Sequence, residues 1–230
     1  MMSWVRENKL AWYERWAVNV LKCGPVPHHV AFIMDGNRRF ATKTHLKHKT
    51  DGHVKGFDKL AEVLQWCQEI GIKEVTVYAF SIENFKRSSE EVETLMRLAR
   101  EKFSKLMEER DKLNEQGICI RIIGNMSMLP LDLQRIMAEA TLLTQHNRKA
   151  ILNVAFAYTS RDEITESIRT IVKGVEDEEL ETNDVDDELI RKCMYSKDSP
   201  DPDILVRTSG ESRLSDFMLW QVRKATSFLN

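Results

Sequence analysis

Three clusters of polar and basic residues each follow a short apolar run. The first follows residues 29–34 and consists of Asp35, Gly36, Asn37, Arg38 and Arg39. Glycine lets the backbone turn close to a ligand, and arginine presents planar, permanently charged donors to phosphate oxygens. An aspartate among these cations predicts Mg²⁺ held against a polyphosphate, because magnesium commonly takes one or two protein carboxylates plus substrate phosphates. A simple Asx turn with surface arginines is the alternative.

The second cluster follows the apolar run at residues 74–80 and has the sequence SIENFKR. In this string Ser81 and Asn84 supply neutral hydrogen-bonding groups, Phe85 an apolar wall and Arg87 a further cation for phosphate. Taken alone, the string is equally typical of a turn that caps a helix.

The third cluster, RTSGESRLS at residues 207–215, follows the run at 203–206 and places Arg207, Arg213 and Ser215 among small residues. In open parallel sheets, ligands bind beyond the carboxyl ends of the strands. Three strand ends with similar donors therefore predict one shared anion-binding site.

The apolar runs that precede these clusters are rich in β-branched residues and lie at 29–34, 74–80, 118–123, 151–158 and 203–206. Their near-continuous hydrophobicity is typical of parallel strands covered on both faces. Helical periodicity occupies 55–70, 88–116, 130–146 and 160–173, and a short helix is predicted at 216–220. We predict a single α/β domain with a mainly parallel central sheet of five to six strands, flanked by helices.

An amphipathic helix is predicted at residues 3–22, ahead of the Gly24-Pro25 pair, and it carries Trp4, Trp12 and Trp16. The helix either packs on the edge of the core or acts as a lid or interfacial helix, since tryptophan favours surfaces that are apolar on one side and wet on the other. We therefore divide the chain into an N-terminal helix at 1–24 and a catalytic domain at 25–230.

Composition excludes several classes of protein. The 230 residues carry a formal net charge of −2, so bulk electrostatics would not bind nucleic acid. The four cysteines form no C-x-x-C pair, and no apolar window is long enough to span a membrane. The sequence lacks the P-loop, the G-x-G-x-x-G fingerprint, the D-D-x-x-D magnesium motif and the G-x-S-x-G elbow.

The clusters, taken together, resemble the cis-prenyltransferase (undecaprenyl diphosphate synthase) family. The strings that carry the resemblance are HVAFIMDGNRRFA, the Gly52-His53 pair, YAFSIENFKRS and DILVRTSGESRLSDFMLWQ, in family order and over nearly the whole chain. SWVRENKLAWYERW near the N-terminus and the double arginine after MDGN resemble the animal, dolichol-forming branch of the family.

The resemblance implies roles for residues at matching positions. Asp35 would bind Mg²⁺, while Ser81 and Asn84 would act at the reacting end of the site with Phe85 and Arg87. Residues implied in binding the allylic diphosphate are Gly36, Asn37, Arg38, Arg39, Lys49 and His53. Arg207, Arg213 and Ser215 would bind isopentenyl diphosphate.

The implied reaction condenses isopentenyl diphosphate units onto farnesyl diphosphate to give a long-chain, cis-configured polyprenyl (dehydrodolichyl) diphosphate. A growing apolar chain needs an apolar tunnel and then a membrane, because each buried methylene contributes about 0.8 kcal/mol. The resemblance thus implies peripheral association with the cytosolic face of the endoplasmic reticulum membrane. It implies no nucleic acid partner.

The sequence departs from the family pattern at two places. Lys49 stands where the family usually places arginine, which keeps the charge but loses the bidentate fork. After Gln221 the chain diverges as VRKATSFLN, without the family's later strand, Trp-Pro turn, helix and R-x-G motif. In the animal branch a Nogo-B-receptor-like partner subunit supplies that motif. A truncated, inactive isoform with an exposed sheet edge, or a non-catalytic scaffold subunit, is therefore the alternative to a working enzyme.

Overall fold

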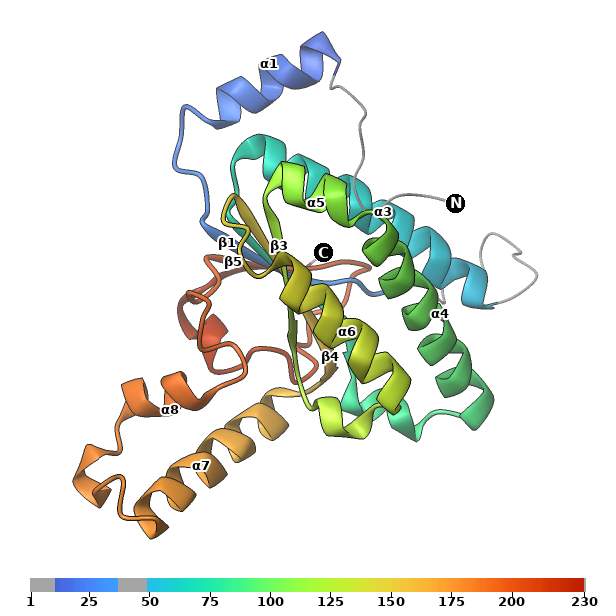
Figure 1. Cartoon of the computed structure of the whole chain (residues 1–230). Coiled ribbons are helices and arrows are strands. Elements are labelled where there is room, and N and C mark those ends of the chain that lie inside the picture. The colour runs from blue at the N-terminus through green and yellow to red at the C-terminus, as the bar shows by residue number, and fades with distance from the viewer. Residues whose placement is uncertain (1–10, 37–48, 230) are drawn as a thin grey trace.

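Six parallel strands form the centre of the molecule (Figure 1). The computed structural model describes the backbone of residues 11–36 and 49–229 and most of their side chains. The sheet order is β3-β4-β2-β1-β5-β6, and every neighbouring pair is parallel. The strands are β1 (His29–Ile33), β2 (Glu74–Ser81), β3 (Ile118–Ile123), β4 (Ala150–Tyr158), β5 (Ile204–Arg207) and β6 (Thr226–Leu229).

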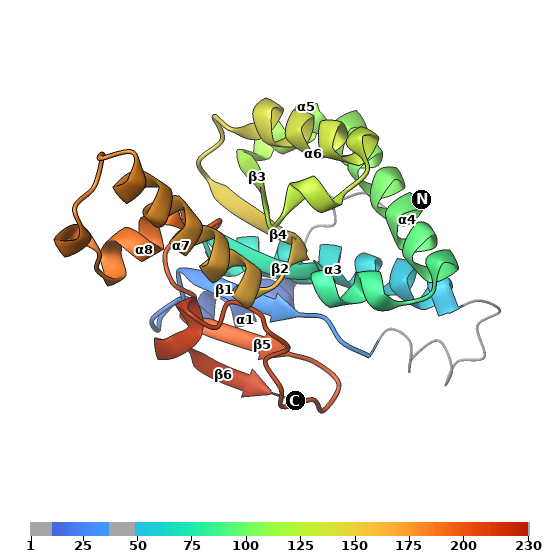
Figure 2. The same ribbon diagram turned by 90° about the horizontal axis from the view of Figure 1, so that it is seen from below.

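Helices cover both faces of this sheet, as the second view shows (Figure 2). One face carries α3 (Lys49–Ile70), α4 (Ser89–Glu108), α5 (Arg110–Gln116) and α6 (Leu131–Thr144). On the other side lie α7 (Ser160–Glu176) and α8 (Asp187–Cys193). The predicted α/β class and the predicted number of strands are confirmed.

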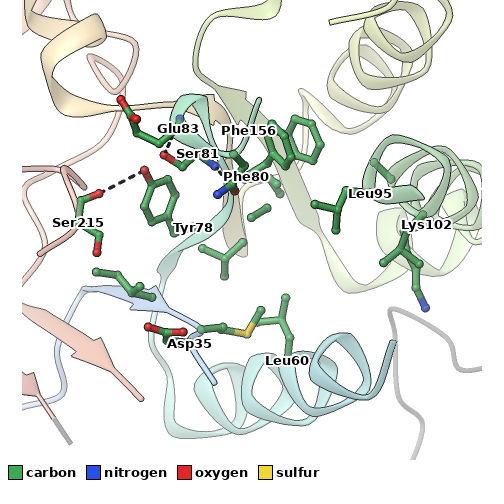
Figure 3. Close-up of a pocket in the computed structure, with 18 of the residues that line it drawn as sticks. Asp35, Leu60, Tyr78, Phe80, Ser81, Glu83, Leu95, Lys102, Phe156 and Ser215 are labelled. Atoms are coloured by element: carbon green, nitrogen blue, oxygen red, sulfur yellow. Dashed lines mark hydrogen bonds between the residues drawn. The ribbon is translucent and has the colours of Figure 1, made fainter. Parts of the chain in front are cut away.

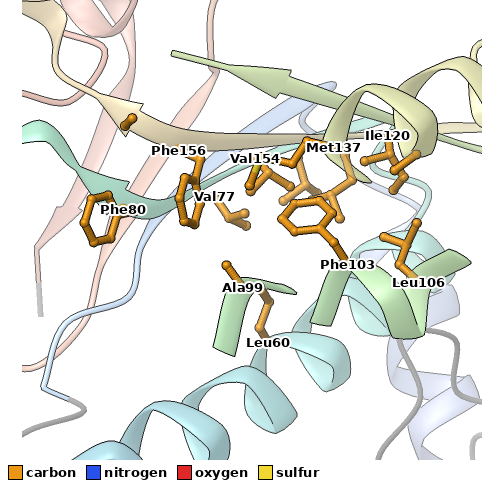
Figure 4. Packing of buried hydrophobic residues seen from close by; sticks show 14 of the residues in the cluster. Leu60, Val77, Phe80, Ala99, Phe103, Leu106, Ile120, Met137, Val154 and Phe156 are labelled. Carbon is orange, nitrogen blue, oxygen red and sulfur yellow. The ribbon is translucent and has the colours of Figure 1, made fainter. Parts of the chain in front are cut away.

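Side chains of the inner strands alternate between the two faces of the sheet, and each face carries an apolar cluster. Val30 packs in the cluster under α3 to α6, whereas Ala31 and Ile33 pack in the cluster on the opposite face. On the first face the side chains of Val77, Val154 and Phe156 lie above Phe103 and Leu106 of α4 (Figure 4). This coverage of both faces explains why the strands read as continuous apolar runs.

Two predicted elements differ from the observed ones, and one observed strand was not predicted. The long helix expected at 88–116 is two helices, because the backbone leaves helical geometry at Glu109 (φ −95°, ψ 11°). No helix forms at 216–220; residues there turn, and Asp216 and Met218 have positive φ. Residues 226–229, for which no strand was expected, form β6, which pairs with β5 and is the last strand at that side of the sheet.

The N-terminal helix is α1 (Trp12–Leu21), which packs on α3 and buries none of its own residues. The first part of the predicted helix, including Trp4, lies outside the described residues. Within the described ranges, no helix is long and apolar enough to cross a membrane.

Two short 3₁₀ turns interrupt the connections on the α3–α6 side, η1 (Ile82–Lys86) and η2 (Met126–Met128), and two more occur later, η3 (Thr182–Asp184) and η4 (Gln221–Lys224). Of these, η1 directly follows β2 and therefore lies at the edge of the sheet where the predicted site should form.

A buried polar layer crosses the second face of the sheet around His29. The His29 ring is fully buried, with Nδ1 2.7 Å from the Pro200 carbonyl oxygen and Nε2 2.7 Å from Thr76 Oγ1. Asn153 Nδ2 donates to Glu74 Oε1 at 2.6 Å and to Thr76 Oγ1 at 3.0 Å. A carbonyl accepts only, so Nδ1 carries the proton and Nε2 accepts from the threonine hydroxyl.

We expect His29 to make the fold sensitive to mild acid. Burial lowers the pKa of His29 below its ordinary value of 6.5, so the native ring stays neutral where the unfolded ring becomes protonated. The contribution of His29 to the free energy of unfolding is therefore present above pH 6.5 and is lost as pH falls through the native pKa. Over this range the free energy of unfolding falls by up to about 1.4 kcal/mol per pH unit.

Urea unfolding of the wild type and of His29→Gln at pH 7.5, 6.5 and 5.5 measures this contribution. The variant should show a shallower decline between pH 6.5 and 5.5, whatever its absolute stability. Equal slopes in the two proteins would contradict the assignment of a neutral native ring.

Candidate active site

The carboxyl ends of three adjacent strands meet at one edge of the sheet. In the order β2-β1-β5, the two pairs are parallel, so the segments that follow these strands emerge side by side. The three polar clusters of the sequence are those segments. The predicted convergence of the strand ends is therefore observed for the described residues.

Asp35, two residues after the end of β1, forms an ion pair with Arg207, the last residue of β5. Arg207 Nη2 donates to Asp35 Oδ2 at 2.7 Å. The Arg207 side chain is 5% exposed and that of Asp35 37% exposed, so the cation is held inside while the carboxylate faces the mouth of the site. The pair joins residues that are 172 positions apart in the sequence.

Arg207 is held from its other side by the segment after β5. Its Nη1 donates to Ser215 Oγ at 2.6 Å and to the carbonyl oxygen of Arg213. Nε of the same guanidinium is buried without a hydrogen-bond partner among the described residues. The guanidinium is thus fixed in orientation by three oxygen atoms, which preorganises it as a donor to an anion.

Hydrogen bonds from side-chain hydroxyls to a backbone carbonyl hold the segments after β1 and β5 against each other. Thr208 Oγ1 donates to the Asp35 carbonyl oxygen at 3.0 Å, and Ser209 Oγ donates to the same oxygen at 2.8 Å. Gly36 has a φ of +89°, and a Cβ at this position would lie 1.9 Å from Ser209 Oγ. Glycine is therefore required for both the backbone conformation and the close approach of the two segments.

Replacing Gly36 by alanine should destabilise the protein by at least about 1–2 kcal/mol, the cost of a left-handed backbone at a residue with Cβ. The clash with Ser209 adds to this cost. Urea unfolding of Gly36→Ala, of Ser209→Gly and of the double variant separates the two terms. In the double variant, the stability lost to the clash should be recovered, and the stability lost to the backbone conformation should not. If the stability changes of the two single variants simply added up in the double variant, the close approach of Gly36 and Ser209 would be contradicted.

At the end of β2, the polar groups cap a 3₁₀ turn. The Ser81 backbone N–H donates to Asn84 Oδ1 at 3.0 Å, and the Glu83 backbone N–H donates to Ser81 Oγ at 3.2 Å. The capping turn that the sequence left as an alternative is thus present, and both side chains also line the cavity described below.

The remaining residues of this cluster differ in their surroundings. Arg87 lines the cavity and pairs with Glu91 of α4 at 2.7 Å. Phe85 is not among the residues lining the cavity; it packs edge-to-face on Phe80, with ring centroids 4.9 Å apart. Its contribution to the site is therefore through the position of Phe80, which does line the cavity.

A cavity of about 870 Å³ opens between the strand ends and α3 and α4. Its polar mouth includes Asp35 and Ser215, while Leu60, Phe80 and Leu95 lie deeper along an apolar wall (Figure 3). The wall continues into the core through Ala99, Phe103, Val154 and Phe156. One end of the cavity therefore suits an anion and the other suits a hydrocarbon.

Tyr78, in β2, forms the boundary between the two ends. Its ring stacks on Phe217 with centroids 4.5 Å apart, and its hydroxyl donates to the Tyr158 carbonyl oxygen at 3.1 Å. Burial raises the pKa of Tyr78 to about 12, so the hydroxyl stays protonated and acts as a donor at neutral pH.

Several predicted site residues are not placed with the others. Asn37, Arg38 and Arg39 lie outside the described residues; Lys49 and His53 belong to α3, but their side chains are likewise not described. The Arg213 side chain is 78% exposed and pairs with Glu211, so only its backbone carbonyl reaches Arg207.

The residues present suit a magnesium ion that is completed by a substrate. Among the described residues, no group of three or more histidine, cysteine, aspartate or glutamate side chains could hold a metal alone. Asp35 offers a hard, partly exposed carboxylate beside an anion-binding cation, and magnesium needs only one or two such carboxylates when phosphates supply further oxygens.

Sequence reasoning missed four residues that shape the site: Tyr78, Thr208, Ser209 and Asp216. Tyr78 lies within an apolar run, and nothing in its spacing distinguishes it from core residues. Thr208 and Ser209 belong to the third cluster, and their hydroxyls in a glycine-containing turn were a usable signal.

These features define a class of protein: a parallel α/β domain whose strand-end site joins a carboxylate and a buried arginine to an apolar cavity. The chain belongs to the undecaprenyl diphosphate synthase family of prenyltransferases, whose family model (Prenyltransf) matches residues 33–230. The resemblance stated from the sequence motifs is confirmed.

Individual relatives support this membership. The chain is 56% identical over 220 residues to the dehydrodolichyl diphosphate synthase complex subunit DHDDS of Homo sapiens, a match that covers 96% of this chain and 66% of the relative. It is 45% identical over 216 residues to a tritrans,polycis-undecaprenyl-diphosphate synthase (geranylgeranyl-diphosphate specific) of Pyrococcus abyssi, covering 94% of this chain and 81% of the relative. The chain thus spans about two thirds of the human subunit.

A solved structure has the same fold. The lavandulyl diphosphate synthase of Lavandula x intermedia, crystallised with dimethylallyl diphosphate, superimposes with a TM-score of 0.83 at 32% sequence identity. The match covers 89% of this chain and 87% of that protein.

Proposed function

We propose that this chain is the catalytic subunit of a cis-prenyltransferase that adds isopentenyl diphosphate to farnesyl diphosphate and makes a long-chain polyprenyl (dehydrodolichyl) diphosphate. The observation that carries the proposal is the cavity, because its polar mouth holds the Asp35–Arg207 pair and its deeper wall is mainly apolar. A prenyl diphosphate has the same two parts.

Departure of diphosphate from the allylic substrate concentrates negative charge on its oxygens. Preorganised donors aimed at such charge are the largest single source of catalysis in many enzymes. Arg207, with its orientation fixed by Asp35, Ser215 and the Arg213 carbonyl, is such a donor. Asp35 would hold Mg²⁺, which would supply Lewis-acid stabilisation of the phosphate oxygens.

Other residues bind and orient the substrates in this proposal. Ser81, Asn84 and Arg87 would contact the reacting end from the β2 side of the mouth, and Gly36 would bring the backbone close to the allylic diphosphate. Phe80, Leu95 and Phe156 would receive the hydrocarbon chain and exclude water from it.

A scaffold role is not favoured, because a scaffold needs neither an ion pair at the strand ends nor a cavity behind it. We also propose a Nogo-B-receptor-like partner subunit and a place on the cytosolic face of the endoplasmic reticulum membrane. The name of the human relative, a complex subunit, supports the partner.

Incorporation of radiolabelled isopentenyl diphosphate into butanol-soluble product tests the activity. The full chain is assayed with farnesyl diphosphate, with and without Mg²⁺, and with and without a co-expressed partner subunit. Label should enter long-chain product only when Mg²⁺ is present. Absence of product in every combination, from protein that is folded by circular dichroism, would overturn the proposal.

Membrane association would depend on α1, whose Trp12, Tyr13 and Trp16 side chains are exposed. Tryptophan and tyrosine favour the membrane interface, and burying a large apolar side chain contributes about 1.5–3 kcal/mol. We therefore expect Trp12→Ala/Trp16→Ala to weaken binding to phospholipid vesicles at least tenfold in cosedimentation. A matched change of exposed Leu142 to alanine on α6 should leave binding unaltered, and equal losses would contradict a role for α1.

A further inference from the structure

The segment after β5 has an unusual backbone between Ser215 and Met218. Ser215, Asp216 and Met218 have φ values of +50°, +57° and +49°, although none of them is glycine. Such conformations are unfavourable for residues with a Cβ, and they persist only where the surroundings enforce them. They occur here next to Arg207, so the contacts that enforce them bear on the site.

Asp216 makes those contacts with the start of α7. The Asp216 carbonyl oxygen accepts from the Ser160 backbone N–H at 2.7 Å. Its carboxylate accepts from the Arg161 backbone N–H at 3.2 Å and from Arg161 Nε at 2.7 Å. The Asp216 side chain is 14% exposed and that of Arg161 73% exposed, so the carboxylate is the enclosed member of the pair.

Two further contacts extend this attachment. The Leu219 backbone N–H donates to Ser160 Oγ at 2.8 Å, which fixes the segment on the far side of Asp216. Arg161 Nη2 lies 3.6 Å from Glu83 Oε1, so the same arginine also reaches the turn after β2. The segments after β2, β4 and β5 are thereby joined at the first turn of α7.

This attachment is continuous with the donor network of the site. Ser215, the neighbour of Asp216, accepts from Arg207 Nη1, and Arg207 Nη2 donates to Asp35. Both Ser215 and Asp216 line the cavity. Displacement of Asp216 would therefore move Ser215 and release one side of the Arg207 guanidinium.

We propose that Asp216 is a positioning residue: its attachment to Ser160 and Arg161 at the start of α7 holds Ser215 against Arg207, and so sets the affinity of the site for isopentenyl diphosphate. This inference rests on the proposed function for its substrate. Asp216 acts through Ser215 and Arg207 and takes no part in the bond-making step.

Steady-state kinetics of Asp216→Ala, Asp216→Gly and Asp216→Asn test the proposal. Asp216→Ala should raise KM for isopentenyl diphosphate about tenfold or more, which corresponds to loss of a hydrogen-bonded charge. KM for farnesyl diphosphate should change far less. Asparagine keeps an acceptor oxygen and tolerates positive φ, so Asp216→Asn should recover most of the loss.

Asp216→Gly separates anchoring from backbone strain, because glycine adopts positive φ freely but lacks the carboxylate. We expect its KM to stay as high as that of Asp216→Ala. Recovery in Asp216→Gly would overturn the proposal, since strain alone would then explain the alanine result. A fall in kcat at unchanged KM would also overturn it, because that pattern indicates only a smaller folded fraction.

Hydrogen–deuterium exchange gives a readout that needs no catalysis. In Asp216→Ala, amides of residues 213–220 should exchange at least tenfold faster, while those of β3 and β4 keep their wild-type rates. If the wild type shows no transfer, the proposed function fails, and the exchange result still decides whether Asp216 anchors the segment. Unchanged exchange in residues 213–220 would refute the anchor.

Discussion

Asp35→Asn should lower the rate of isopentenyl diphosphate incorporation by about 100- to 1,000-fold, the loss seen when one charge-stabilising group is removed from a preorganised site. Asparagine keeps an oxygen that can accept from Arg207, so the fold should survive. The carboxylate that would bind Mg²⁺ is lost, so added Mg²⁺ should restore little of the rate. Product formation is measured at saturating farnesyl diphosphate over a range of Mg²⁺ concentrations.

Asp132→Asn is the matched control for this variant. Asp132 is a surface aspartate on α6 that also pairs with an arginine, Arg100, and it lies outside the cavity. It should keep the wild-type rate. Near wild-type activity in Asp35→Asn would remove the basis for a metal role at the end of β1.

Arg207→Gln should lower kcat/KM for isopentenyl diphosphate by about 100-fold or more, because it removes the fixed guanidinium from the mouth of the cavity. It should also destabilise the protein by about 1–3 kcal/mol, since it removes the buried guanidinium whose hydrogen bonds tie Asp35, Ser215 and the Arg213 carbonyl together. Kinetics and urea unfolding measure the two effects separately.

Arg100→Gln serves as the control, because it breaks an exposed arginine–aspartate pair of the same kind away from the site. Exposed pairs contribute about 0–1 kcal/mol, so its stability and activity should stay near those of the wild type. A loss of stability in Arg207→Gln without any loss of activity would assign Arg207 to the fold alone.

Much of the fold could be predicted because the strands are covered on both faces. This coverage makes them read as continuous apolar runs, and the run at residues 118–123 coincides with β3. The break at Glu109 was missed because helical periodicity continues across it. The strand β6 was missed because TSFL is short and pairs only at the sheet edge.

The candidate site could be predicted only in part, because the sequence indicates where segments meet but not how their side chains are oriented. Glycine and charged residues directly after strands indicate where segments meet, and this signal located Asp35 and Arg207. It does not indicate which way a side chain points, and Arg213 turns to the surface and to Glu211. Contacts such as Asp216 with Arg161 depend on tertiary packing that spacing does not encode.

The 172-residue separation of Asp35 and Arg207 has a consequence during synthesis of the chain. The ribosome releases β1 long before β5, and a nascent chain that ends before β5 lacks half of the ion pair. Under the proposed function, such a chain lacks Arg207 and Ser215 and so could not bind isopentenyl diphosphate at this site; binding of that substrate would therefore report that β5 has joined the sheet. Since a ligand that binds only the native state stabilises all of it, substrate would select finished molecules over incomplete ones.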